Sequence, residues 1–158
     1  ADGQLLITAA LHGHSAASSL GKSDPARSAH AVGHGLRQMH DALPIGACPF
    51  DWDLESRIKH LPADQQAEFL DNAPELDLVV CHGDACLPNT IITDDHEFSA
   101  HVDLGMLGLA DRWADLAIAA WSTEWNYGPG FEQDVYAGYG IEPDERKISF
   151  YRRVWDAA

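Results

Sequence analysis

Residues 81–116 read CHGDACLPNTIITDDHEFSAHVDLGMLGLADRWADL, and they are the most informative segment of the chain. It begins with Asp84 in a glycine-containing turn, and Asn89 follows five positions later. Residues 90–93 and 98–102 are strand-like and are joined by a polar turn, which predicts a β-hairpin. Asp103 comes directly after that hairpin. We therefore expect the hairpin to fix the positions of the loops at its two ends.

These three polar residues carry the side chains that phosphoryl transfer needs. A carboxylate must orient the attacking hydroxyl, while an amide oxygen and a second carboxylate hold the magnesium that neutralises the phosphates. The spacing H-x-D-x-x-x-x-N followed by D-x-G is the arrangement found in kinases. Either aspartate alone would read as an ordinary surface acid, so only the ordered set favours catalysis.

The sequence resembles the aminoglycoside phosphotransferase family, especially its 3'-hydroxyl branch. The resemblance is carried by residues 82–89, HGDACLPN, and by VDLG, GLADR and a final aspartate within residues 102–115. It extends more weakly to residues 36–40, 48–51 and 139–152. It implies an α+β, protein-kinase-like fold, here a mainly helical C-terminal lobe with a short catalytic hairpin. It also implies ATP- and Mg²⁺-dependent phosphorylation of a hydroxyl on an aminoglycoside antibiotic, which confers resistance.

By position, the resemblance assigns roles to individual residues. Asp84 matches the catalytic aspartate that also meets the substrate, and Asn89 and Asp103 match the magnesium ligands that bind the nucleotide. Glu124 and Asp156 are the nearest candidates for carboxylates that bind the polycationic substrate. Four further residues are expected to support the site: His82, Asp111, Arg112 and Asp115.

The supporting residues have local reasons for those roles. His82 can hold its turn by hydrogen bonding. Asp111 is expected to cap the helix that follows it, and Arg112 could bridge Asp115 or the catalytic loop.

Three features depart from the family. The chain has no glycine-rich phosphate loop and no V-A-I-K-like strand with a lysine, so the N-terminal lobe is largely absent. The stretch between Asp53 and Leu76 is short, which marks either a shortened relative or joined pieces of a longer chain. Met106 stands where the family commonly carries a basic residue. We expect one domain, a hinge strand over about residues 1–12 plus the C-terminal lobe, inactive by itself.

The composition favours a cationic partner. The 158 residues include 25 acids and 10 bases, for a net charge of -15. This charge repels nucleic acid and anionic membranes and attracts a polycation, although acidity also keeps a chain in solution. No run of 18 apolar residues occurs, and residues 1–4 lack a signal-peptide pattern. The sequence thus predicts a cytoplasmic protein that binds neither nucleic acid nor membrane.

Other elements follow from hydrophobic spacing and from capping residues. The sequence predicts strands over residues 5–11 and 76–81. It predicts helices over residues 25–43, 54–60, 63–72 and 142–155, and one more after Asp111.

Three alternatives remain open. The acceptor could be another alcohol, such as a macrolide, choline or a homoserine-like compound, although the ACLPN and ADR motifs favour aminoglycosides. The chain could instead be a catalytically inactive module that binds a cationic ligand. His30 and His34, four apart on a predicted helix, could share a zinc ion, although no carboxylate is placed with them.

Overall fold

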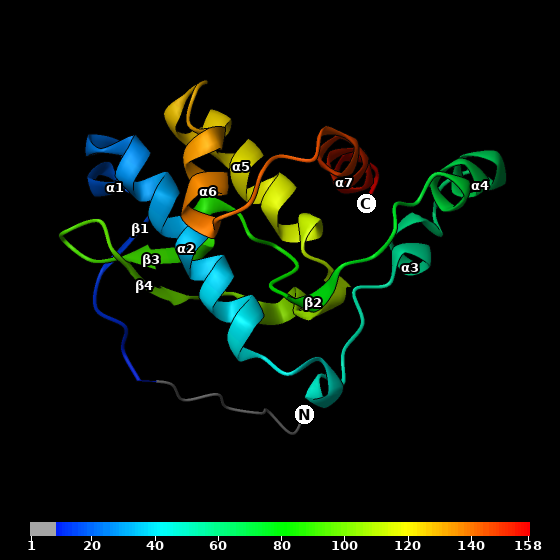
Figure 1. Ribbon diagram of the computed structural model, residues 1–158, viewed down its shortest axis with the longest axis horizontal. Helices are drawn as coiled ribbons and strands as arrows, with labels where there is room; N and C mark the ends of the chain where they lie inside the picture. The colour runs from blue at the N-terminus through cyan, green and yellow to red at the C-terminus, as the bar shows by residue number, and fades with distance from the viewer. Residues whose placement is uncertain (1–8) are drawn as a thin grey trace, which may run out of the picture.

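The computed structural model of the chain describes residues 9–158. A group of helices packs against two small sheets (Figure 1). The helices are α1 Ser19–Ser23, α2 Pro25–Ala42, α3 Leu54–Ile58, α4 Ala63–Asp71, α5 Trp113–Tyr127, α6 Glu132–Tyr139 and α7 Glu145–Ala157. The strands are β1 His14–Ser15, β2 Leu78–Cys81, β3 Thr90–Ile92, β4 Phe98–His101 and β5 Gly108–Asp111. Short 3-10 turns are η1 Ile45–Ala47, η2 Leu87–Asn89 and η3 Leu104–Met106.

The pairing of the strands brings two loops together. β2 and β5 form an antiparallel pair in which Cys81 lies opposite Gly108. In the second sheet, of order β1-β3-β4, Thr90 lies opposite His101 across the hairpin. The segments that connect these two sheets, residues 82–89 and 102–107, start and end opposite each other and therefore run side by side.

α2 is the longest helix and packs against α6. Its N-terminus is capped by Asp24, whose Oδ1 accepts the Arg27 N–H at 3.2 Å. Gly33 faces α6 so closely that a Cβ there would overlap a backbone oxygen, and the same holds for Gly138 on α6 facing α2. These two glycines let the helix backbones touch.

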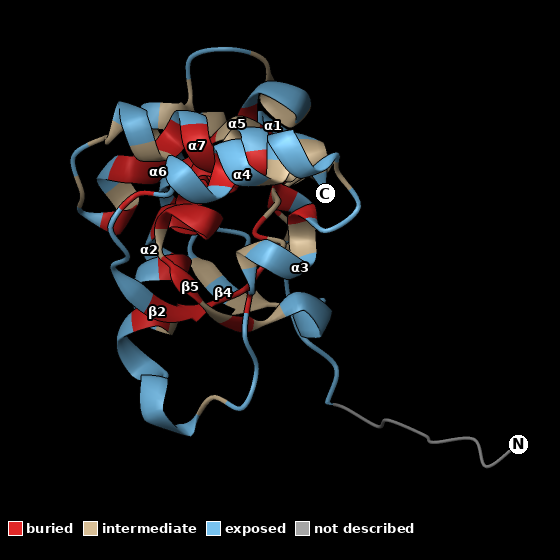
Figure 2. Cartoon of the chain, turned by 90° about the vertical axis from the view of Figure 1, so that its right-hand side faces the viewer, coloured by how far each residue is buried: buried red, intermediate tan, exposed pale blue. Residues whose placement is uncertain are grey.

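The core lies between the helices and the strands, where the buried segments of α2, α5, α6 and α7 meet (Figure 2). α5 is buried on nearly every side from Trp113 to Ala120, which is typical of a central helix. Each fully buried leucine, such as Leu36 or Leu116, contributes about 1.5–3 kcal/mol through burial of apolar area. α5 thus forms a rigid base beneath the loops.

The mainly helical α+β architecture agrees with the fold expected from the sequence. The expected helices correspond to α2, α3, α4, α5 and α7, and the expected hairpin corresponds to β3 and β4. The strand predicted for residues 5–11 falls mostly outside the described residues, and residues 9–12 form no strand. Four elements were not expected: β1, α1, β5 and α6. Among the described helices, none has the length and apolar character needed to span a membrane.

Candidate active site

The loop that carries Asp84 follows β2 and is held by backbone geometry. Gly83 has a φ of +84°, a left-handed value that glycine adopts without strain. A Cβ at Gly83 would overlap the carbonyl oxygen of Met106, so the loop lies directly against η3. The buried His82 donates from Nε2 to the Val102 carbonyl (2.9 Å) and accepts the Asp84 N–H at Nδ1 (3.3 Å). His82 thus ties the loop to the end of β4.

The buried Asp115 on α5 binds this loop from the core side. Its Oδ2 accepts the backbone N–H of His82 at 2.6 Å, and its Oδ1 accepts that of Gly83 at 2.9 Å. His40 on α2 places Nε2 3.0 Å from the same Oδ2. Burial alone would raise the pKa of Asp115, but the hydrogen bonds from His40 and the two amides lower it overall. The carboxylate is therefore a charged, buried anchor for the loop.

We expect Gly83→Ala to lower the free energy of unfolding by about 1–3 kcal/mol, because alanine is strained at this φ and its Cβ meets backbone. Urea unfolding measures the effect on stability. Gly46→Ala is the matched control, since open space surrounds that position. Equal stability of the two variants would contradict the tight contact between the loop and η3.

Asn89 and Asp103 lie on the two adjoining segments. The Asn89 side chain donates from Nδ2 to the Asp84 carbonyl at 2.9 Å, which leaves Oδ1 as its atom for another partner. The Asn89 carbonyl in turn accepts the N–H of Val102, directly before Asp103, at 2.9 Å. Asp103 adopts φ 59° and ψ 53°, an uncommon left-handed conformation for an aspartate. Such strained residues cluster at functional sites.

Together these contacts hold Asp84, Asn89 and Asp103 on two backbone segments that are bonded to each other. The Asp84 loop touches η3, His82 and Asn89 both bind Val102, and Asn89 binds Asp84. The arrangement can present two carboxylates and one amide oxygen at the same end of the hairpin.

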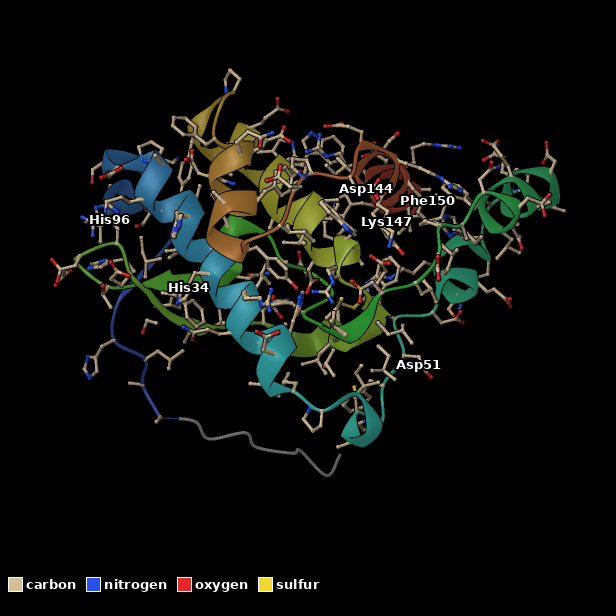
Figure 3. All side chains as sticks on the ribbon, viewed as in Figure 1. His34, Asp51, His96, Asp144, Lys147 and Phe150 are labelled. Atoms are coloured by element: carbon tan, nitrogen blue, oxygen red, sulfur yellow. The ribbon has the colours of Figure 1, made fainter. Side chains whose placement is uncertain are left out.

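Asp111 and Arg112 behave differently from each other. Asp111 ends β5, and its Oδ1 accepts the N–H of Trp113 at 2.8 Å, so it satisfies a donor at the start of α5. Its Oδ2 pairs with Lys147 of α7 at 2.6 Å, a residue labelled in Figure 3. The predicted bridge from Arg112 to Asp115 or the catalytic loop is wrong.

Arg112 instead pairs with Asp77, with 2.6 Å between Nε and Oδ2. It also donates from Nη1 to the Tyr139 hydroxyl at 2.8 Å. The physical reason is that the Asp115 carboxylate points inward to three other donors, so it is not available on the surface where Arg112 lies.

The two candidate substrate acids lie on two different helices, and neither is bonded to this constellation in the described residues. Glu124 is exposed near the end of α5, and Asp156 is exposed on α7. Asp156 lines a shallow pocket between α4 and α7, together with Glu68 and Arg153. Among residues 9–158, no hydrogen bond or ion pair links either acid to the Asp84 loop.

Sequence reasoning missed two residues near the site, His40 and Arg57. His40 sits at a buried position of α2, one turn after Leu36, but nothing in the helical pattern reveals that it meets Asp115. Arg57 lies on α3 and lines a pocket with Gly105 and Met106. The position of Arg57 next to η3 depends on tertiary packing, which no local sequence motif indicates.

The structure gives no support to a zinc site at His30 and His34. These residues line a small pocket with Arg27, His96 and Glu97, and the Glu97 carboxylate is already paired with Arg27 at 3.3 Å. The His34 ring, labelled in Figure 3, bonds the Gln38 side chain through Nε2 at 2.7 Å. Within residues 9–158, the one grouping with metal-ligand geometry is His40, Cys81 and Asp115.

That buried grouping is a poor metal centre. Burial raises the pKa of the Cys81 thiol well above its ordinary value, so the thiolate that a metal requires is disfavoured. The Asp115 carboxylate is already occupied by three N–H donors. The grouping is better explained as hydrogen-bonded core.

Comparison with known proteins gives a consistent family relationship. A family model described as the phosphotransferase enzyme family matches residues 3–151. Streptomycin 3''-kinase of Streptomyces griseus is 32% identical over 185 residues, which covers 94% of this chain and 66% of the relative. Curated relatives of this kind are longer, and the chain spans between about half and two thirds of their length.

Solved structures agree with the fold. A crystal structure of an aminoglycoside-3'-phosphotransferase of type VIII superposes with a TM-score of 0.75 at 26% identity, over 94% of this chain and 67% of the other. An aminoglycoside phosphotransferase from Streptomyces rimosus, in complex with ADP and streptomycin, gives a TM-score of 0.69 at 26% identity, over 94% and 68%.

Proposed function

Because this chain belongs to the phosphotransferase enzyme family, we propose that the complete protein transfers the γ-phosphate of ATP to a hydroxyl of an aminoglycoside. The observation that carries the proposal is the joining of two loops: the Asp84 loop packs on η3, and Asn89 is bonded to both Asp84 and Val102. Two carboxylates and an amide oxygen on adjoining segments fit in-line phosphoryl transfer.

Each residue has a definable task in this reaction. Asp84 accepts the proton of the substrate hydroxyl as its oxygen attacks the γ-phosphorus, and the bond to the departing ADP breaks. Asn89 Oδ1 and the Asp103 carboxylate are oxygen ligands of the kind that Mg²⁺ prefers, and the fixed Asn89 side chain fits that task. When bound, the ion neutralises charge on the phosphates. His82 and Asp115 hold the loop in shape.

Two features support a cationic acceptor. The net charge of -15 attracts a polycation over long distances. Streptomycin occupies a solved relative of the same fold. Glu124 and Asp156 are proposed as outlying carboxylates for amino groups of the substrate, because both are exposed and charged.

The test uses the complete protein, ATP and a panel of acceptors that includes streptomycin and kanamycin-type compounds. We expect ADP release coupled to a phosphorylated aminoglycoside, detected by mass spectrometry. Asp103→Asn should weaken the apparent Mg²⁺ affinity by about 10- to 100-fold or more, because a charged ligand is lost. Asp94→Asn, an exposed aspartate on the hairpin turn, is the control.

The outcomes separate the alternatives. Phosphate transfer to choline, a macrolide or a homoserine-like alcohol, with none to aminoglycosides, would show that the acceptor is a different alcohol and that the phosphotransfer reaction is the same. Aminoglycoside binding without any ATP turnover would favour an inactive binding module instead.

A further inference from the structure

Arg57 on α3 is a partly buried cation without a carboxylate partner. Its guanidinium carbon lies 4.0 Å from the centre of the Trp52 ring, so it is held by stacking. Among residues 9–158, its guanidinium makes no ion pair or hydrogen bond. The other partly buried arginines, Arg112 and Arg152, each bind a carboxylate. Arg57 is therefore exceptional in keeping all its donors free.

The pocket beside Arg57 adjoins the Asp84 loop. It measures about 500 Å³ and is lined by Arg57 and Ser56 from α3 and by Gly105 and Met106 from η3. Two acids also line it, Asp51 and Asp53; the Asp53 carboxylate accepts the backbone N–H groups of Glu55 and Ser56 at the start of α3. The Met106 carbonyl oxygen is the atom against which Gly83 packs, one residue before Asp84. One wall of this pocket is thus in direct contact with the backbone of the proposed catalytic loop.

The electrostatic surroundings agree with this placement. Burial lowers the pKa of Arg57, while the negative charges of Asp115 and Asp84 act in the opposite direction. A guanidinium stays charged even so, because its ordinary pKa is above 12.

The segment that carries the proposed catalytic residues has no lysine or arginine of its own. Residues 81–111 contain neither lysine nor arginine, yet they contribute the carboxylates of Asp84 and Asp103. A phosphoryl group in transfer carries negative charge on three oxygens, which a nearby cation with fixed donors stabilises. Arg57 is a free, pre-positioned cation at the edge of this acidic segment.

We propose that Arg57 binds the phosphoryl group during transfer, its guanidinium held on the Trp52 ring and directed toward the space beside Asp84. The inference rests on the proposed function and adds a phosphate-binding residue to it. The guanidinium offers two parallel N–H donors to phosphate oxygens, which an ammonium group cannot match. Its largest effect should therefore fall on kcat.

The experiment compares Arg57→Met and Arg57→Lys in the complete protein with Arg27→Met, an exposed arginine of α2 paired with Glu97, as the control. We expect kcat to fall about 100-fold for Arg57→Met and less for Arg57→Lys, with KM for the acceptor nearly unchanged. Binding of inorganic phosphate, measured by calorimetry, should weaken in the methionine variant. Arg27→Met should behave as the wild type.

A compensating variant tests the location of the charge. Met106 lines the same pocket and is 51% exposed, so an arginine is accommodated there. Arg57→Met combined with Met106→Arg should recover at least about tenfold of the lost kcat, because a cation returns to the pocket. A structural role for Arg57 predicts no such recovery.

Each result decides the matter. Wild-type kcat and phosphate binding in Arg57→Met would overturn the role of Arg57 while leaving the proposed transfer intact. Loss of activity together with a lowered Tm, and without recovery in the double variant, would also overturn it. A wild-type protein that transfers no phosphate to any acceptor would defeat the proposed function itself.

Discussion

Asp84→Asn should reduce kcat for phosphate transfer by about 100- to 10,000-fold while leaving the fold intact. The amide has the same shape as the carboxylate but cannot accept a proton from the substrate hydroxyl. The backbone N–H and carbonyl of Asp84, which bind His82 and Asn89, remain in place. Steady-state assays of ADP release in the complete protein measure the change, and circular dichroism and Tm check the fold.

A matched control lies on the hairpin. Asp95 is exposed at the turn between β3 and β4, so Asp95→Asn removes one negative charge without touching the loop. We expect its kcat to stay near that of the wild type. An Asp84→Asn variant that keeps more than about a tenth of wild-type kcat would remove Asp84 from the role of proton acceptor.

Asp115→Ala should be the most destabilising single change near the site, lowering the free energy of unfolding by about 3–5 kcal/mol. The substitution leaves three N–H donors, from His82, Gly83 and His40, buried without their acceptor. Asp115→Asn should cost nearly as much, because its NH₂ group would face one of those donors. Urea unfolding measures both variants.

Surface and buried carboxylates can be compared directly. Asp41 forms an exposed pair with Arg37 at a distance of 2.6 Å, and Asp41→Ala should change stability by less than about 1 kcal/mol. If Asp115→Ala proves as mild as Asp41→Ala, then the buried carboxylate does not anchor the loop.

The stabilising effect of the Asp115 carboxylate should depend on pH. The pKa of Asp115 is lower in the folded protein than its ordinary value, so the stability that this carboxylate contributes is present above that ordinary pKa. It is lost as the pH falls below about 4, through the folded-state pKa. The difference in unfolding free energy between wild type and Asp115→Asn should therefore shrink in acid.

The sequence was sufficient for the parts of the site that are local. The glycine turn at Gly83, the hairpin and the spacing from Asp84 to Asn89 are short-range patterns, and the structure contains the turn and the hairpin where they were expected. The helix expected from residue 25 likewise begins at Pro25, with Asp24 as its N-cap. In these places capping, turn chemistry and hydrophobic spacing all agree.

Long-range contacts were beyond sequence reasoning. β5 reads as a continuation of a loop, and it becomes a strand only through pairing with β2, which lies about 30 residues earlier. Arg112 and Asp115 are three residues apart, a spacing at which helical side chains can pair, so an ion pair between them was expected. In the structure the Asp115 side chain points into the core, and Arg112 pairs with Asp77 instead. The approach of Arg57 to η3 depends in the same way on where α3 packs.

The buried carboxylate beneath the loop has a consequence for ligand binding. Because Asp115 fixes the amides of His82 and Gly83 from inside the core, this stretch of backbone has little conformational entropy left to lose when a ligand arrives. The binding free energy of an incoming molecule is then available to align its reactive oxygen, because little of it is needed to order this backbone.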